Sequence, residues 1–212
     1  KVRTIIEETA TTFVNYPRHY RYDFADTSKM IWMSERDNWN HLYLYNVANG
    51  KVIKQITKGA WCVREVVKVD EKNNTIYFSA SGVNPKEDPY QIHYYRINMD
   101  GKNMICLTPA EGNHQAVFSN DMKYVVDKYS KVDTPPVTEL RSGVDGSLIS
   151  TIAKADISKL KESGWVAPEI FKAKGRDGVT DIWGIIQRPT NFDSTKKYPV
   201  IEYIYAGPGD AY

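Results

Sequence analysis

Few residues of this 212-residue chain have the types and spacing that bond-making chemistry requires. No two histidines have the HxxxH spacing of a zinc site, and no Gly-x-Ser-x-Gly turn for a serine nucleophile occurs anywhere. We therefore expect neither a metal site nor a complete catalytic triad, and we interpret each histidine as a strand or loop residue. The histidines are His19, His41, His93 and His114.

The remaining candidates are two adjacent carboxylates and two thiols. Glu7 and Glu8 stand near the start of the chain, and we interpret them as solvated charges. Cys62 and Cys106 lack CxxC spacing, so we expect free, partly buried thiols that do not identify a redox compartment. The closing stretch GPGDAY has only the first half of a glycine-rich phosphate loop, which is a weak signal.

Composition narrows the class of protein. Apolar residues make up 42% and charged residues 25%, which is typical of globular domains. Because the net charge is +2, no strong field favours nucleic acid or an acidic membrane, and we expect no nucleic-acid partner. The apolar runs are too short to span a bilayer. The first residues lack a signal-peptide core and the last lack a closing element, so we expect a piece of a longer protein.

The elements that must position these residues follow a repeat. Residues 24–57, 69–108 and 118–153 each read as a polar turn, an apolar strand, a variable loop, an alternating strand, a tight turn and a final strand. The tight turns ANGK, MDGK and VDGS place glycines at positions 50, 101 and 146. Asn-Gly and Asp-Gly between alternating strands favour hairpins, because both turn positions need a positive φ.

A further strand precedes each segment, at residues 21–24, 63–69 and 114–118. Four strands at a period of roughly 45–50 residues predict the blades of a β-propeller, about three of them, within residues 1–153. The alternative is an irregular sandwich of hairpins, which rarely repeats one turn residue in every unit. A complete ring needs four or more blades, so the two end blades should leave open, apolar faces.

The stretch ERDNWN, residues 35–40, is the loop between the second and third strands of the first unit. Its counterparts, GVNPKEDPYQ and KVDTPP, differ from it in length and chemistry, as surface loops do. We expect Trp39 and His41 to cover the end of this hairpin and to pack on a neighbouring blade. Contact with a substrate is the alternative.

The pattern changes after residue 153. We expect a helical linker over residues 154–167, with Asp156 as N-cap and Gly164 ending the helix. A new domain should start at residue 168 with a hairpin. Residues 200–205 are apolar enough to form a strand buried on both faces. The predicted fold is mainly β, a partial propeller followed by the first strands of another domain.

Several stretches resemble the prolyl oligopeptidase family of serine peptidases, in its dipeptidyl peptidase IV branch. KKYPVIEYIYAGPG, residues 196–209, resembles the opening of that family's α/β-hydrolase domain. SERDNWNHLYLY, ITKGAW and FSNDMKYVVDKYS resemble its last propeller blades. The resemblance implies an eight-bladed propeller that caps the hydrolase domain. Residues 1–153 would then be the C-terminal blades, and residues 168–212 the first strands of a truncated α/β-hydrolase domain.

The resemblance also implies a catalytic role for Tyr205. In the family, the tyrosine of Tyr-Ala-Gly-Pro donates a hydrogen bond to the oxyanion of the reaction. Gly207 and Pro208 turn the chain sharply, which would present Tyr205 at the carboxyl edge of its strand. The alternative is a core aromatic, as Tyr203 could be. The family's amine-binding acids should lie elsewhere, because Glu7 and Glu8 are in the wrong part of the propeller.

Two functions remain as alternatives. The first is a serine exopeptidase parent that releases N-terminal dipeptides, after proline or alanine, by Ser-His-Asp acyl transfer. Its propeller would gate and bind the peptide substrate, and this chain alone would be inactive. The second is a propeller binding module without peptidase activity. The resemblance implies no cofactor, leaves a homodimeric parent open, and leaves the compartment open between a bacterial periplasm and the cytoplasm.

Overall fold

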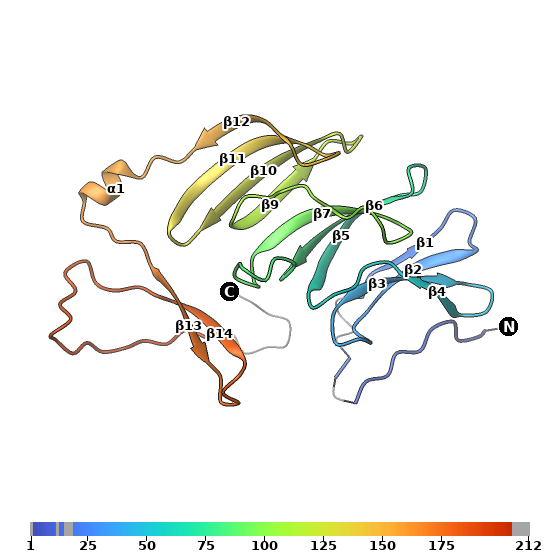
Figure 1. Ribbon diagram of the computed structural model, residues 1–212, viewed down its shortest axis with the longest axis horizontal. Coiled ribbons are helices and arrows are strands. Elements are labelled where there is room, and N and C mark those ends of the chain that lie inside the picture. The colour runs from blue at the N-terminus through green and yellow to red at the C-terminus, as the bar shows by residue number, and fades with distance from the viewer. Residues whose placement is uncertain (1, 12, 15–18, 205–212) are drawn as a thin grey trace.

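The computed structural model describes residues 2–11, 13–14 and 19–204. Its strands form three four-stranded antiparallel sheets and one two-stranded hairpin (Figure 1). Blade 1 contains β1 (Arg21–Asp23), β2 (Lys29–Ser34), β3 (His41–Asn46) and β4 (Lys51–Gln55). Blade 2 contains β5 (Cys62–Asp70), β6 (Thr75–Ser81), β7 (Ile92–Asn98) and β8 (Ile105–Cys106). Blade 3 contains β9 (Asn113–Phe118), β10 (Tyr124–Lys131), β11 (Thr134–Ser142) and β12 (Leu148–Lys154).

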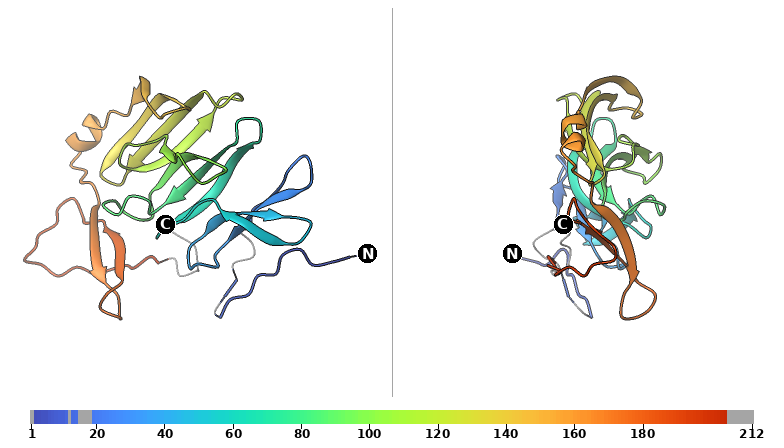
Figure 2. Two further views of the ribbon diagram at one scale, coloured as in Figure 1. Left: turned by 45° about the vertical axis from the view of Figure 1, so that its right-hand side comes forward. Right: turned by 90° about the vertical axis from the view of Figure 1, so that its left-hand side faces the viewer.

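Each blade is a simple meander in which consecutive strands are hydrogen-bonded neighbours. The strands that the repeat predicted are present, and the additional strand before each segment becomes the first strand of its blade. The prediction of a mainly β fold with three propeller-like blades is confirmed. In two views the blades follow one another side by side in chain order, like the sectors of a fan (Figures 1 and 2).

The apolar core lies between adjoining blades rather than inside any one of them. β6 is buried at all seven positions, because its sheet has a neighbouring blade on each side. Phe78 of β6 is 0% exposed and stacks between Trp61 and Tyr95, with ring centroids 6.2 Å and 5.7 Å away. Ile31, Met33 and Leu42 of blade 1 belong to the same cluster. A blade therefore depends on its neighbours for stability, as in other repeat proteins.

The two end blades differ in how their outer faces are covered. In blade 3 the face away from blade 2 is open, with Val117 71% and Tyr124 51% exposed. In blade 1 the N-terminal segment, residues 2–8, covers part of the equivalent face. Its Ile5 and Ile6 pack against a cluster of three buried residues, Met30, Tyr43 and Tyr45. The prediction of two open faces is therefore correct for blade 3 and only partly correct for blade 1.

The repeated glycines lie where the last turn of each blade meets the preceding structure. Gly50, Gly101 and Gly146 have φ values of 67°, 78° and 75°, in the region that favours glycine. A Cβ atom on Gly146 would lie 2.5 Å from the carbonyl oxygen of Cys106, at the end of blade 2. One on Gly101 would lie 2.8 Å from the carbonyl oxygen of Ile56, just after β4. The repeat therefore requires glycine both for its backbone conformation and for the close approach of blades.

We expect Gly146→Ala to destabilise the protein by more than about 2 kcal/mol, because a left-handed alanine costs about 1–2 kcal/mol and the backbone of blade 2 must also shift. Gly178→Ala is the matched control, since Gly178 has a φ of 72° and a Cβ atom added there would meet nothing within 4 Å. It should cost about 1–2 kcal/mol. Equilibrium urea unfolding gives both values. Equal losses would show that close approach between blades is unimportant.

After blade 3 the chain forms a short helix and a hairpin. The helix, α1 (Ser158–Glu162), lies within the predicted linker. Its N-cap is Ile157, one residue after the predicted Asp156, although Asp156 does accept the backbone N–H of Ser158 at 2.9 Å. β13 (Glu169–Lys174) and β14 (Asp181–Ile186) pair as the predicted hairpin. No helix among the described residues is long and apolar enough to cross a membrane.

The predicted buried strand after this hairpin is not formed. Residues 200–204 have no strand conformation, and Val200 and Ile201 are 90% and 95% exposed. A strand buried on both faces needs hydrogen-bonded neighbours and covering layers, and no described strand pairs with these residues. Residue 205, the end of the predicted strand, lies outside the described residues.

Candidate functional site

The loops that join the second and third strands of each blade lie at the same end of their sheets as the connections between blades. This placement follows from the antiparallel meander and is confirmed by contacts from blade to blade. Asn40, at the end of the first such loop, exchanges hydrogen bonds with the backbone of Val63, at the start of blade 2. The backbone N–H of Ile92 donates to the side chain of Asn113 at 3.0 Å. We refer to this end, with residues 35–40, 82–91 and 131–133, as the loop face.

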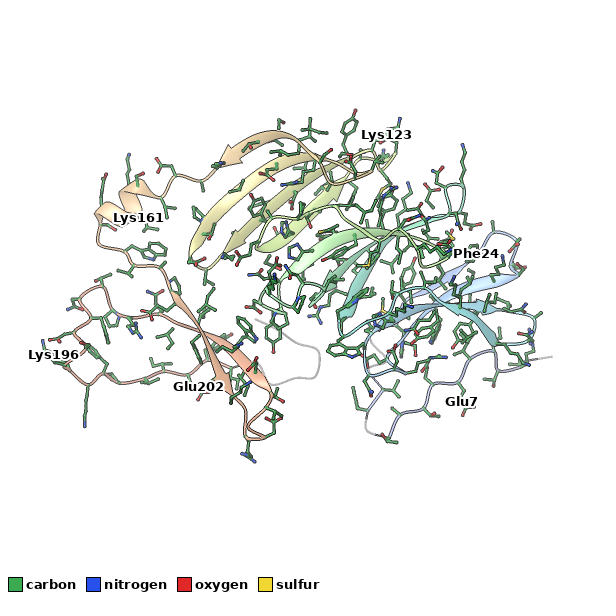
Figure 3. The ribbon with its side chains drawn as sticks, viewed as in Figure 1. Glu7, Phe24, Lys123, Lys161, Lys196 and Glu202 are labelled. Atoms are coloured by element: carbon green, nitrogen blue, oxygen red, sulfur yellow. The ribbon has the colours of Figure 1, made fainter. Side chains whose placement is uncertain are left out.

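The N-terminal segment is attached to blade 1 near this face through Glu8. Its carboxylate accepts hydrogen bonds from the indole of Trp32 at 2.9 Å, the hydroxyl of Ser34 at 3.0 Å and the guanidinium of Arg36 at 2.5 Å. The Glu8 side chain is 15% exposed. The interpretation of Glu8 as a solvated charge is therefore wrong, because three donors on one strand and its following loop replace water. Glu7 is exposed, as predicted, on the segment beside the blade (Figure 3).

Arg36 connects this ion pair to two tyrosines. Its guanidinium lies over the rings of Tyr43 and Tyr45, 4.7 Å and 5.4 Å from their centroids. Burial alone would lower the pKa of Arg36, but the hydrogen bond and the charge of Glu8 outweigh burial and raise it. Burial raises the pKa of Tyr45, and the nearby Arg36 partly offsets that effect. Arg36 is thus a permanently charged centre that holds the 35–40 loop against the blade.

Glu8→Gln should lower the free energy of unfolding by about 1–2 kcal/mol, because hydrogen bonds to a charged group are stronger than neutral ones and water partly screens Arg36. Glu7→Gln is the matched control, and should change stability by no more than about 0.5 kcal/mol. Urea unfolding of the two variants provides the measurement. A Glu8→Gln protein as stable as the control would mean that the segment is held by its other contacts, those of Arg3, Ile5 and Ile6.

The prediction that Trp39 and His41 pack on a neighbouring blade is confirmed for His41, the first residue of β3. His41 is fully buried, its ring meets Trp61 edge-on at 4.8 Å, and its Nε2 faces the carbonyl oxygen of Gly59 at 3.0 Å. Its Nδ1 lies 3.0 Å from the hydroxyl of Thr57. Trp39 remains 40% exposed. His41 is a structural residue of the junction, and Trp39 is exposed together with the rest of residues 35–39.

His93 and His114 come together at the junction of blades 2 and 3, with ring centroids 4.6 Å apart. Each faces a carboxylate, Glu87 in one case and Asp127 in the other, both at 2.8 Å. Nothing in the sequence indicated that these two histidines would lie together. Both histidines are buried strand residues, which confirms that part of the interpretation. His19 stacks on Trp32 at 5.4 Å and is also engaged in packing.

The cysteines are free, partly buried thiols, as predicted. Cys62 starts the first strand of blade 2, and Cys106 ends its last strand. Burial raises the pKa of Cys106, which makes it a poor nucleophile. Within the described residues no group of three or more acidic, histidine or cysteine side chains could hold a metal ion.

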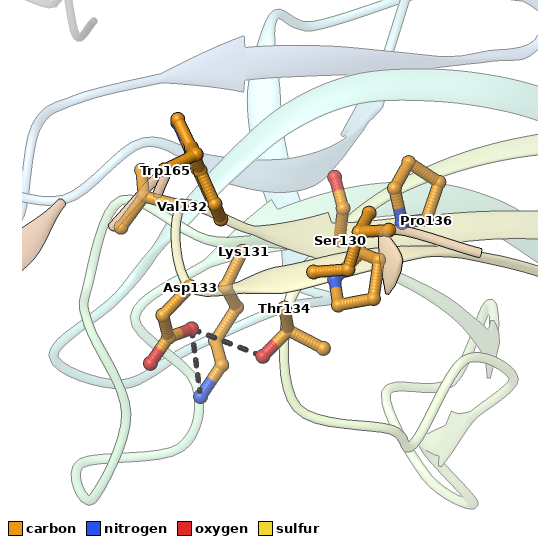
Figure 4. Close-up of a pocket in the computed structure, with 9 residues that line it drawn as sticks. Ser130, Lys131, Val132, Asp133, Thr134, Pro136 and Trp165 are labelled. Atoms are coloured by element: carbon orange, nitrogen blue, oxygen red, sulfur yellow. Dashed lines mark hydrogen bonds and ion pairs between the residues drawn. The ribbon is translucent and has the colours of Figure 1, made fainter. Parts of the chain in front are cut away.

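Two hollows are present in the described part of the chain. One, of about 190 Å³, lies where the linker meets the β10–β11 hairpin, between Trp165 and the turn that carries Lys131 and Asp133 (Figure 4). Lys131 and Asp133 are 3.9 Å apart, and Thr134 donates to Asp133 at 3.0 Å. The other, of about 250 Å³, lies between blades 1 and 2 beside Phe24 and Met99. Neither brings a nucleophile next to a base.

The proposed oxyanion donor, Tyr205, lies outside the described residues. The loop face thus offers aromatic, amide and charged groups suited to binding, and the described residues contribute no bond-making machinery to it. Residues 1–136 match the family described as "Dipeptidyl peptidase IV (DPP IV) N-terminal region". The chain belongs to the dipeptidyl peptidase IV family.

Individual relatives agree with this membership. The chain is 36% identical over 186 residues to the dipeptidyl peptidase 4 of Arthroderma otae, a match that covers 84% of the chain and 23% of that protein. A crystal structure of a Bacteroides ovatus protein described as a dipeptidyl aminopeptidase IV has a TM-score of 0.66 and 26% identity, covering 84% of this chain and 27% of that one. The structure of Porphyromonas gingivalis dipeptidyl peptidase 4 has the same fold, with a TM-score of 0.65 at 23% identity over 87% of this chain and 25% of that one. The chain spans about a quarter of the length of the relatives it matches.

Proposed function

We propose that this chain is the part of a dipeptidyl peptidase in which the propeller ends and the hydrolase domain begins. The proposal assigns residues 1–153 to the last blades, 154–167 to a helical linker and 168–212 to the first strands of an α/β-hydrolase domain. The order of elements carries it. Three blades with a family match are followed by a linker, a hairpin and the sequence YAGP.

The proposed reaction of the parent is removal of dipeptides from peptide N-termini, after proline or alanine, by Ser-His-Asp acyl transfer. The names of the relatives support a dipeptidyl peptidase. This chain has no Gly-x-Ser-x-Gly sequence, so the nucleophile elbow would come from another part of the parent. The chain alone should therefore show no hydrolysis.

In this proposal the blades bind and gate the peptide substrate. The 35–40 loop offers Trp39, which is partly exposed, while Glu8 and Arg36 fix the loop in place. A rigid blade that presents variable loops is how many scaffolds position binding residues. Such a surface can orient a peptide but cannot cleave it.

The single catalytic group that we assign to this chain is Tyr205. Its position directly before Ala206, Gly207 and Pro208 supports the assignment. A tyrosine hydroxyl that donates where negative charge develops would stabilise the tetrahedral intermediate.

Reading the gene downstream of Tyr212 and labelling the full-length protein with a fluorophosphonate tests the proposal. We expect a Gly-x-Ser-x-Gly sequence, with the label attached to its serine. The second candidate is a propeller binding module without peptidase activity. It is favoured because the described residues show no nucleophile next to a base. An elbow in which serine is replaced, together with no labelling, would support that module and overturn the peptidase.

A further inference from the structure

A cluster of buried charged groups at the junction of blades 2 and 3 is not needed for any of the roles above. Its centre is the pair His93 of β7 and His114 of β9, whose rings are tilted by 42° with centroids 4.6 Å apart. His114 and its partner Asp127 are both 0% exposed at their side chains. His93 and its partner Glu87 are 8% and 16% exposed. Buried charges are costly unless they are paired, so their protonation matters for folding.

The hydrogen bonds of His114 require two N–H groups on one ring. Nδ1 lies 2.8 Å and 3.0 Å from the two carboxylate oxygens of Asp127. Nε2 lies 2.7 Å from the carbonyl oxygen of Ala110. A carbonyl and an ionised carboxylate can only accept hydrogen bonds. A neutral imidazole has one N–H and one lone pair, and would therefore place a lone pair against one of these oxygens.

His93 has the same requirement. Its Nδ1 lies 2.7 Å from the carbonyl oxygen of Thr108, and its Nε2 lies 2.8 Å from the carboxylate of Glu87. His41, at the junction of blades 1 and 2, is different. Only its Nε2 faces a carbonyl oxygen, because the Thr57 hydroxyl at its Nδ1 can donate. A neutral ring can make both hydrogen bonds of His41. It cannot make both hydrogen bonds of His93, or both of His114.

The charge of the cluster leads to the same conclusion. Arg141 of β11 lies 3.8 Å from Asp127 and 2.7 Å from Glu139, both through its guanidinium nitrogens. With neutral histidines, one cation would face three carboxylates, those of Glu87, Asp127 and Glu139. With two imidazolium ions the cluster holds three cations and three anions. This balance with the three carboxylates offsets the repulsion between the two imidazolium rings, whose centroids are 4.6 Å apart.

The other titratable groups that face the pair do not change this balance. Lys131 pairs with Glu111 at 2.8 Å and lies 3.9 Å from Asp133, at the edge of the cluster. The phenol of Tyr129 stacks on His114 and donates to Glu139. Burial raises the pKa values of the surrounding phenols and thiol, which keeps them neutral; these are Tyr94, Tyr95, Cys106 and Tyr129.

We propose that His93 and His114 are both imidazolium ions in the folded protein. In this form His93 joins the 82–91 loop to the connection between blades 2 and 3, and His114 joins that connection to β10. Loss of either proton leaves an acceptor facing a lone pair and gives the cluster a net negative charge. Glu87 would then release the loop that carries it. With both protons in place, every ring nitrogen of the pair donates to an oxygen, and two of these hydrogen bonds join opposite charges.

Neutron diffraction from deuterium-exchanged crystals of the full-length protein at about pH 7 counts these protons directly. We expect deuterium on both ring nitrogens of His93 and of His114. His41 is the internal control and should carry deuterium on Nε2 only. A single deuterium on the ring of His93 or His114, or deuterium on the carboxyl group of Glu87 or Asp127, would overturn the proposal.

The neutron measurement does not depend on peptidase activity, so its outcome is independent of the proposed function.

Discussion

In the full-length protein, Tyr205→Phe should lower kcat and kcat/KM together by about 10²–10³-fold, the usual cost of losing one oxyanion donor. The substitution removes only the hydroxyl oxygen and keeps the ring, so KM should change little. A group that acts only in the transition state affects both kinetic constants equally. Steady-state kinetics on a chromogenic dipeptide substrate provides the measurement.

Tyr203→Phe is the matched control for this experiment. Tyr203 lies two positions earlier in the same apolar stretch and is not the tyrosine of the Tyr-Ala-Gly-Pro sequence. Its loss of a hydroxyl should leave kcat within about twofold of wild type. A Tyr205→Phe enzyme with unchanged kcat would make Tyr205 a structural aromatic and leave this chain with no catalytic residue.

The largest effect on stability is expected from Phe78→Ala. Phe78 is 0% exposed between Trp61 and Tyr95, in the core that blades 1 and 2 share. Deleting a buried phenyl ring removes its burial and leaves a cavity, which together cost about 3–5 kcal/mol. Because the cavity would lie between two blades, both should lose stability together.

Tyr90→Ala removes an aromatic ring of similar size from the 82–91 loop, where Tyr90 is 48% exposed. It should cost about 0.5 kcal/mol or less. Urea unfolding, followed by fluorescence and by circular dichroism, gives both values. If Phe78→Ala cost no more than Tyr90→Ala, the core would not depend on contact between the blades.

The blades could be predicted because their signals are local. Alternating strands and the glycines at 50, 101 and 146 each specify a hairpin within a few residues, and the repeat supplied the number of strands. Only one of the two reasons that glycine is needed could be predicted from the sequence. Positive φ can be read from Asn-Gly and Asp-Gly, whereas the approach of Gly146 to the end of blade 2 depends on packing.

Errors arose where partners are distant in sequence. Glu8 binds Trp32, Ser34 and Arg36, which lie 24 to 28 positions away, and nothing near Glu8 indicates them. Residues 200–204 failed as a strand for a related reason. Their apolar composition suits a buried strand, but forming one requires neighbouring strands and covering layers that no described segment supplies.

The histidines were predicted only as strand or loop residues, and their cluster was not predicted. His41 and His93 stand at the start of the third strand in consecutive blades, a repeat that points to the junctions. Their partners differ: His41 meets the hydroxyl of Thr57 and the ring of Trp61, whereas His93 meets the carboxylate of Glu87 and the ring of His114. Such partners are determined by the packing of blades, and spacing along the chain does not reveal them.

Release of dipeptides by the full-length protein tests the proposed peptidase function most directly. Peptides with proline or alanine at the second position should lose their N-terminal dipeptide, as followed by mass spectrometry, and prior treatment with a fluorophosphonate should stop the reaction. Peptides that remain intact, or that lose single residues, would contradict the account. Release that continues after fluorophosphonate treatment would contradict the serine mechanism.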